Sequence, residues 1–126
     1  MSRIRIALAG LAAVVAVVGV TAGSSFAAAG TSKASTTVTV KASEFKFVLS
    51  SKTVAKPGKV VFKVTNTGKE AHNFVILSGI NKATPLIQPH KSATLTVTFK
   101  KAGKYTYECT VGEHAEEGML GSFLVK

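Results

Sequence analysis

Several residue types are scarce in this chain of 126 residues. It has a single cysteine, Cys109, so no disulfide can form within the chain. It has no aspartate, and its only arginines are Arg3 and Arg5. Arginine is the main reader of base edges, and the lysines are spread along the chain, so nucleic acid is not expected as a partner. The lone cysteine must be a buried thiol, an intermolecular bridge, a nucleophile or a metal ligand.

A long stretch near the beginning of the chain carries no charge. No residue between Arg5 and Lys33 is charged, and residues 6–20 are almost wholly Ala, Val, Leu, Ile and Gly. Basic residues, an apolar stretch and small residues at 27–29 together indicate a secretory signal peptide. We predict a signal peptide at residues 1–29, a flexible linker at 30–37 and one domain at 38–126. The protein is then exported, to the periplasm or the extracellular space.

An uncleaved membrane anchor is the alternative for this segment, because the uncharged stretch is long enough to span a bilayer. A lipid on a processed N-terminal cysteine is excluded, since the only cysteine is Cys109. The formal net charge is +10, from 16 basic and 6 acidic residues. This balance favours solubility and attraction to anionic surfaces, but it says little about fold.

Apolar and polar residues alternate with a period of two along most of the chain after residue 36. The clearest case is the segment 92–99, in which Ala93, Leu95, Val97 and Phe99 would face inward. Turn signals recur every eight to twelve residues, and no segment after residue 29 has a helical period. These features predict an all-β fold, an antiparallel Greek-key β-sandwich of about seven or eight strands.

Four potential metal donors stand out against this background. Cys109, His114 and Met119 lie on one short stretch after a predicted strand, and His72 precedes the apolar run 74–77. One thiolate, two imidazoles and a thioether form a donor set typical of copper in electron-transfer sites. Alone, His72 would be a hydrogen-bonded residue at a strand end and Met119 a core residue. Their joint spacing favours the interpretation as ligands.

The chain resembles the cupredoxins, or small blue copper proteins, over most of residues 36–126. Plastocyanin-like, azurin-like and auracyanin-like members are the most similar. The resemblance rests on His72-Asn73 and on the segments 103–109, 114–119 and 121–125. One departure is Gly112-Glu113, where many relatives have Pro-Gly immediately before the histidine. His90 precedes Lys91 where relatives often have Pro-Gly-Lys-Ser, so it replaces the turn glycine and is expected to be a turn residue and not a ligand.

The resemblance implies roles for these residues. His72, Cys109 and His114 would form the equatorial plane around one type 1 copper ion, with Met119 as the axial ligand. Asn73 would tie the His72 segment to the Cys109 loop by hydrogen bonds. The site would then cycle between Cu(II) and Cu(I). It offers no open coordination position for a substrate, so the protein is not expected to be an enzyme.

The resemblance also suggests how partners would meet the site. Redox proteins would dock near His114, whose ring edge serves relatives as the electron port. Three of the six acidic residues flank this histidine: Glu113, Glu116 and Glu117. They would influence which partner docks, or they would simply be a solvated charged loop. We expect a monomer whose redox partners include a membrane-associated protein.

Other classes of function use some of the same residues. An extracytoplasmic copper carrier would need an exchangeable metal, and such chains are often rich in Met or His, unlike this one. A cysteine hydrolase built on Cys109 would need an orienting residue and an oxyanion site, and only Asn73 fits part of that pattern. A binuclear copper centre would need a second cysteine. Zinc accepts the same donors and could occupy the site in vitro.

Overall fold

The computed structural model describes residues 34–126. The predicted signal peptide and residues 30–33 of the predicted linker lie outside the described residues. Within 34–126 no residue is helical, so no helix there could cross a membrane. Thr36 and Thr37 fall within the predicted linker. In the structure they belong to the first strand, because they pair with Val60 and Val61 of the fourth strand. The strands are β1 (Thr36–Ser43), β2 (Lys46–Leu49), β3 (Thr53–Val54), β4 (Gly58–Asn66), β5 (Val75–Ile76), β6 (Lys82–Ala83), β7 (Ser92–Phe99), β8 (Gly103–Glu108) and β9 (Leu120–Val125).

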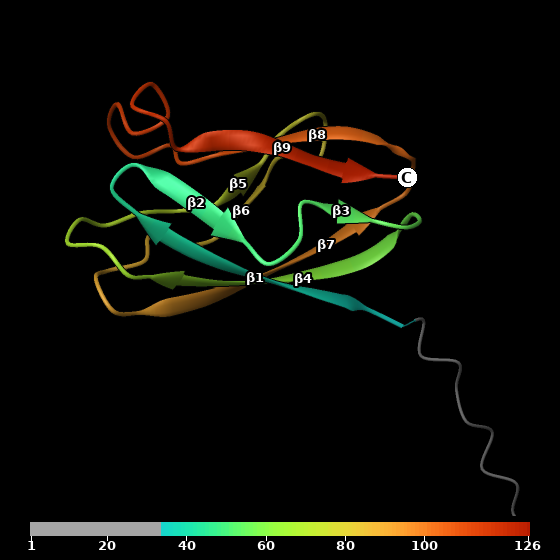
Figure 1. Ribbon diagram of the computed structural model, residues 1–126, viewed down its shortest axis with the longest axis horizontal. Helices are drawn as coiled ribbons and strands as arrows, with labels where there is room; N and C mark the ends of the chain where they lie inside the picture. Colours follow the sequence, from blue (N-terminus) through green and yellow to red (C-terminus); the bar gives the residue numbers. More distant parts are fainter. Residues whose placement is uncertain (1–33) are drawn as a thin grey trace, which may run out of the picture. The chain divides into compact units, whose positions relative to one another are not determined.

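Two sheets pack face to face, which confirms the predicted all-β sandwich (Figure 1). One sheet has the order β2-β1-β4-β7 and the other has the order β3-β9-β8-β5-β6. The described range has nine strands instead of seven or eight because β3, β5 and β6 contain only two residues each.

The two sheets are mixed and not wholly antiparallel. Strand β1 pairs with β4 in parallel, and β3 pairs with β9 in parallel. Between β1 and β4 the chain crosses to the other sheet through β3 and then returns, and such a crossover brings a strand back in the same direction. Alternation of apolar residues is the same in both pairings, so the sequence pattern could not distinguish them.

The core lies between the sheets and is built from the alternate residues that the sequence pattern predicts. Phe62 in β4 is wholly buried, and its ring centroid lies 5.2 Å from those of Phe74 and Phe123. Leu95, Val97 and Phe99 of β7 are buried as predicted. This apolar layer provides the rigid support on which the site at one end is built.

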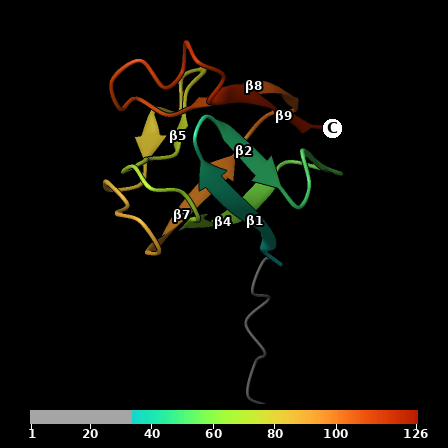
Figure 2. The ribbon, with the colours of Figure 1, turned by 60° about the vertical axis from the view of Figure 1, so that its left-hand side comes forward.

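Loops that carry the candidate donors gather at the same end of the sandwich, as the two ribbon views agree (Figures 1 and 2). The wholly buried Asn66, at the end of β4, ties the segment that leads into His72 to the turn around residues 87–90. Its amide donates to the carbonyl oxygens of Glu70 and Ile87, at 2.6 and 2.9 Å, and its own carbonyl accepts from the amide of His90 at 2.9 Å. His90 is exposed in a turn with φ of 63°, in agreement with the predicted turn role.

Candidate metal centre

His72 lies in the connection between β4 and β5 and is held there by backbone pairing. Its N–H donates to the carbonyl of Ile87 at 3.1 Å, and the N–H of Ile87 donates back at 2.7 Å. Two residues later Phe74 enters the core, with ring contacts to Phe47, Phe62 and Tyr107. His72 is wholly buried, so its ring position is fixed by the framework of the sandwich.

The other three predicted donors lie on the loop of residues 109–119, between β8 and β9. Hydrogen bonds within the loop close it on itself. The N–H of Cys109 donates to the carbonyl of Met119, and the N–H of Met119 donates to that of His114, both at 2.9 Å. The loop needs glycine at position 118, where φ is 123°. Backbone bonds therefore bring the first, middle and last donor of the loop together.

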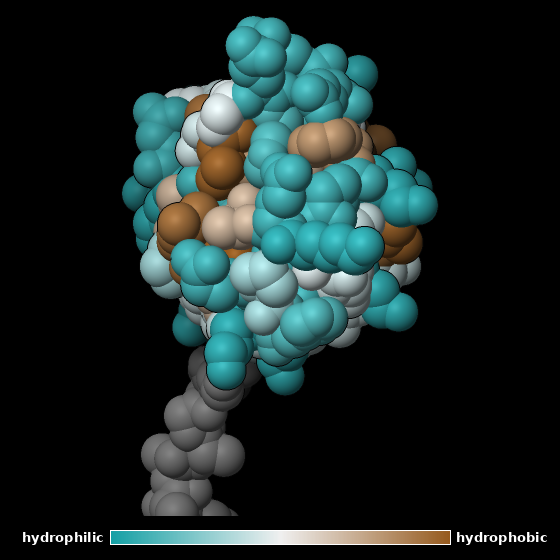
Figure 3. Space-filling view, turned by 90° about the vertical axis from the view of Figure 1, so that its left-hand side faces the viewer, coloured by the Kyte–Doolittle hydropathy of each residue, from teal (hydrophilic) through white to brown (hydrophobic). Residues whose placement is uncertain are grey.

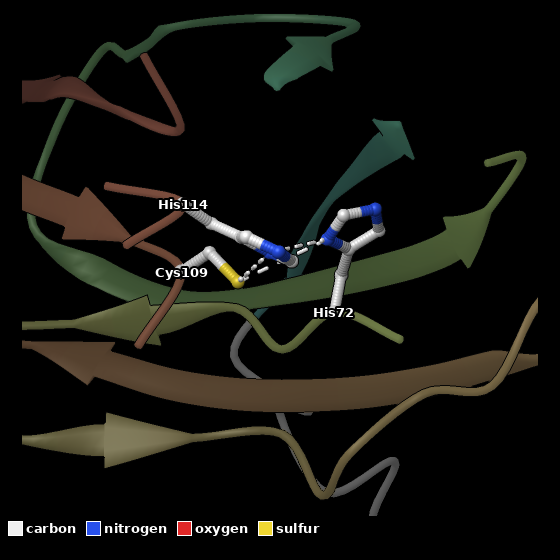
Figure 4. Close-up of side chains that lie close together, drawn as sticks. All are labelled: His72, Cys109 and His114. Carbon is white, nitrogen blue, oxygen red and sulfur yellow. Dashed lines mark hydrogen bonds between the residues drawn. The ribbon is translucent and has the colours of Figure 1, made fainter. Parts of the chain in front are cut away.

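The structure brings three of the predicted donors into one cluster (Figure 4). The Nδ1 atoms of His72 and His114 lie 3.1 Å apart, and the sulfur of Cys109 lies 4.0 Å from the first and 3.7 Å from the second. His72 and Cys109 are wholly buried, and His114 is 8% exposed. In the part of the chain that the structure describes, these are the residues grouped closely enough to share one metal ion.

Met119 occupies a position compatible with the fourth predicted donor. Its side chain is wholly buried and belongs to the same core cluster as Cys109. Its backbone forms hydrogen bonds with the backbones of Cys109 and His114, the other two donors on the loop. A buried thioether beside this cluster fits the long axial ligand of an electron-transfer copper site.

The outer nitrogens of both histidines lie against glutamates. Nε2 of His72 is 3.1 Å from a carboxylate oxygen of Glu44, and Nε2 of His114 is 2.9 Å from one of Glu70. An ionised carboxylate only accepts hydrogen bonds, so the ring hydrogen belongs on Nε2 in both residues. The Nδ1 lone pairs then face each other and the sulfur of Cys109. A shared cation stabilises such an arrangement, and this donor chemistry fits copper.

Glu44 is held as a carboxylate by several hydrogen bonds. The N–H of Glu70, and less strongly those of its own residue and of Lys69, lower its pKa from 4.5 to about 2, with a further contribution from His72. Its side chain is 26% exposed, whereas that of Glu70 is 55% exposed. The carboxylate beside His72 is therefore the better shielded of the two.

Asn73 joins the two parts of the cluster, as the family resemblance implied. Its amide donates to the hydroxyl of Thr110 at 2.7 Å, and its carbonyl accepts from the N–H of the same residue at 2.8 Å. Thr110 follows Cys109 directly in sequence. The expected tie between the His72 segment and the Cys109 loop is confirmed.

Sequence reasoning missed three residues of this site: Glu44, Phe45 and Glu70. The ring of Phe45 meets that of His114 edge-on, with centroids 5.0 Å apart. Both Glu44 and Phe45 lie in the turn between β1 and β2, far in sequence from every donor. Glu70 stands two residues before His72, and this proximity is the one sequence feature that could have placed it at the site. Contacts of this kind depend on tertiary packing and leave no spacing pattern to recognise.

Comparisons with known proteins identify the family and the fold. The family model described as a cupredoxin-like domain matches residues 11–120. No curated protein matches the chain in sequence. The structure is similar to that of dithionite-reduced auracyanin from the photosynthetic bacterium Roseiflexus castenholzii, with a TM-score of 0.64 and 26% identity over 74% of this chain and 98% of that one.

Two other solved structures share the fold. Auracyanin B superposes with a TM-score of 0.62 and 20% identity, over 74% of this chain and 89% of that chain. Auracyanin A, described as a "blue" copper protein from the green thermophilic photosynthetic bacterium Chloroflexus aurantiacus, superposes with a TM-score of 0.62 and 19% identity, over 74% of this chain and all of that chain.

Proposed function

Because the chain belongs to the cupredoxin-like family, we propose that it is a blue copper electron-transfer protein that serves redox partners outside the cytoplasm. The observation that carries this proposal is the convergence of two Nδ1 atoms and one sulfur from three buried residues. The likeness to auracyanins, one of which is described as a blue copper protein, supports it.

His72, Cys109 and His114 would hold the ion, with Met119 as the weak fourth donor. Copper supplies a one-electron couple when it is bound there. The chain's own task is to keep the donor geometry the same in both oxidation states. Backbone pairing of His72 with Ile87 and the hydrogen bonds that close the loop suit that task, because they hold the backbone of the donors in place.

The burial of the donors also bears on what the site would not do. Three of the four side chains are wholly buried, and the fourth donor position would be filled by the thioether of Met119. A substrate would then find no open coordination position, so we propose that the protein is not an enzyme. The same burial disfavours the alternative of an extracytoplasmic copper carrier, which needs rapid exchange of the metal.

His114 is the donor nearest to solvent, and we propose that electrons enter and leave beside it. Figure 3 views the end of the sandwich where the loops gather: hydrophilic residues cover most of it, around a smaller hydrophobic area. A redox protein, a membrane-associated one included, would dock on this end. Glu113, Glu116 and Glu117 are exposed there on the 109–119 loop. They would favour a partner with a basic surface.

Repeated redox cycling distinguishes the electron carrier from the copper carrier. Residues 30–126, loaded with one equivalent of Cu(II), are reduced with ascorbate and reoxidised with ferricyanide beside a strong Cu(I) chelator. An electron carrier returns to its full absorbance in every cycle and keeps its copper. Transfer of the metal to the chelator after the first reduction would instead establish the copper carrier.

A further inference from the structure

The carboxylate of Glu44 occupies a site shaped to hold it beside His72. One of its oxygens, Oε1, accepts three hydrogen bonds: from the amide of Lys69 at 2.8 Å, from that of Glu70 at 2.7 Å and from Nε2 of His72 at 3.1 Å. A single oxygen thus ties the turn between β1 and β2 to the segment that leads into His72.

Gly68 leaves the room for this carboxylate. A Cβ added there would collide with the carboxylate oxygens of Glu44. Gly68 itself is fixed by its N–H, which donates to the side chain of the buried Asn66 at 2.9 Å. The carboxylate is therefore confined between a glycine on one side and a wholly buried histidine on the other.

This placement bears on which nitrogen of His72 carries the ring hydrogen. A carboxylate at Nε2 holds the ring hydrogen there and leaves the Nδ1 lone pair free. It also makes the imidazole a stronger donor and sets a negative charge close to the ion. A negative charge favours the more highly charged Cu(II) over Cu(I).

We propose that Glu44 is a positioning residue that fixes the metal-binding tautomer of His72 and lowers the reduction potential of the site. This inference rests on the proposed copper function. Glu70 has the same relation to His114, but its side chain is more than half exposed, so water screens its charge and its effect is smaller.

Two substitutions separate the hydrogen bond from the charge. Glu44→Gln keeps an acceptor oxygen for all three N–H groups but removes the charge. Glu44→Ala removes both. We expect Glu44→Gln to keep the blue absorption and raise the reduction potential. We expect Glu44→Ala to raise it further, to alter the spectrum and to weaken Cu(II) binding about 10- to 100-fold.

Gly68→Ala provides an independent test, because it displaces the carboxylate without deleting it. The reduction potential of Gly68→Ala should lie between those of wild type and Glu44→Ala. Glu116→Gln is the matched control, since it removes one negative charge from the same end and has no bond to either histidine in the described part of the chain. It should leave the potential nearly unchanged.

A copper-independent measurement keeps this inference separate from the proposed function. Nitrogen-15 NMR of the metal-free protein at pH 8 reports which ring nitrogen carries the hydrogen. We expect the Nε2–H form of His72 in wild type and a mixture of both forms in Glu44→Ala.

Three outcomes would overturn the inference. The first is an unchanged tautomer in Glu44→Ala. The second is unchanged potentials in all Glu44 variants, with only the stability of the metal-free protein reduced, which would make Glu44 a purely structural tie. The third is an equal shift in Glu116→Gln. A wild-type protein without a blue band would contradict the proposed function instead.

Discussion

The donors reach the site from two regions that are built in different ways. The loop half, residues 109–119, supplies Cys109, His114 and Met119 and closes through its own backbone hydrogen bonds. The framework half, residues 70–74 with Glu44, supplies only His72 and depends on pairing with Ile87 and on the core below it. Donor spacing in the loop half is a local property of the sequence. The framework half exists only when the whole sandwich has folded.

The largest expected effect comes from removing the core beneath the framework half. Phe74→Ala should reduce the free energy of unfolding of the metal-free domain by about 3–5 kcal/mol, because the wholly buried ring packs against three other aromatic rings. Urea unfolding measures this loss. Leu120→Ala, at a side chain that is 55% exposed, is the control and should change stability by less than about 0.5 kcal/mol. Equal losses in the two variants would contradict the account of the core.

The hydrogen bonds between Asn73 and Thr110 join the two halves, and removing them should give the next largest loss of stability. Asn73→Ala removes both hydrogen bonds to Thr110 and should cost about 1–2 kcal/mol. Thr110→Val removes only the bond to the hydroxyl, since the backbone N–H remains, and should cost roughly half as much. Urea unfolding of both variants tests the order. A Thr110→Val protein less stable than Asn73→Ala would show that these two bonds are not what joins the halves.

Acid should lower the free energy of unfolding, because it protonates the Glu44 carboxylate that supports the framework half. Its pKa is about 2 in the folded protein, below the ordinary value of 4.5, so the unfolded chain takes up a proton first as the pH falls. The stability that the carboxylate contributes is complete above pH 4.5 and is lost between about 4.5 and 2. The difference in unfolding free energy between wild type and Glu44→Gln, measured without metal, should shrink across this range. A difference independent of pH would contradict the lowered pKa.

Substitution of exposed residues on the 109–119 loop should have the smallest effect on the structure. Glu116→Lys with Glu117→Lys should leave the fold and the blue spectrum unchanged, because both side chains are exposed. At low salt, however, oxidation by anionic ferricyanide should become faster and reduction by cationic hexaammineruthenium should become slower. Stopped-flow measurements with both reagents test this. Rates equal to those of wild type would mean that the glutamates are only a solvated surface.

The two halves also differ in how far the sequence predicts them. Cys109, His114 and Met119 are recognisable because they are close in sequence, and His72 because an apolar strand follows it. The alternation that predicts the sandwich also identifies its inward residues, such as Phe99. Parallel pairing of β1 with β4 is not predictable in this way, because alternation is the same in both directions. Glu44 and Phe45 are missed because only the folded chain brings them to the histidines.

The most direct test of the account is the spectrum of the domain loaded with Cu(II), beside that of Cys109→Ser. An electron-transfer copper centre should give an intense blue absorption band and a small copper hyperfine splitting in paramagnetic resonance, both lost in the variant. A colourless wild-type protein with an ordinary cupric spectrum would contradict it. Cys109 would then be a core thiol, and the cluster with His72 and His114 would be no electron-transfer centre.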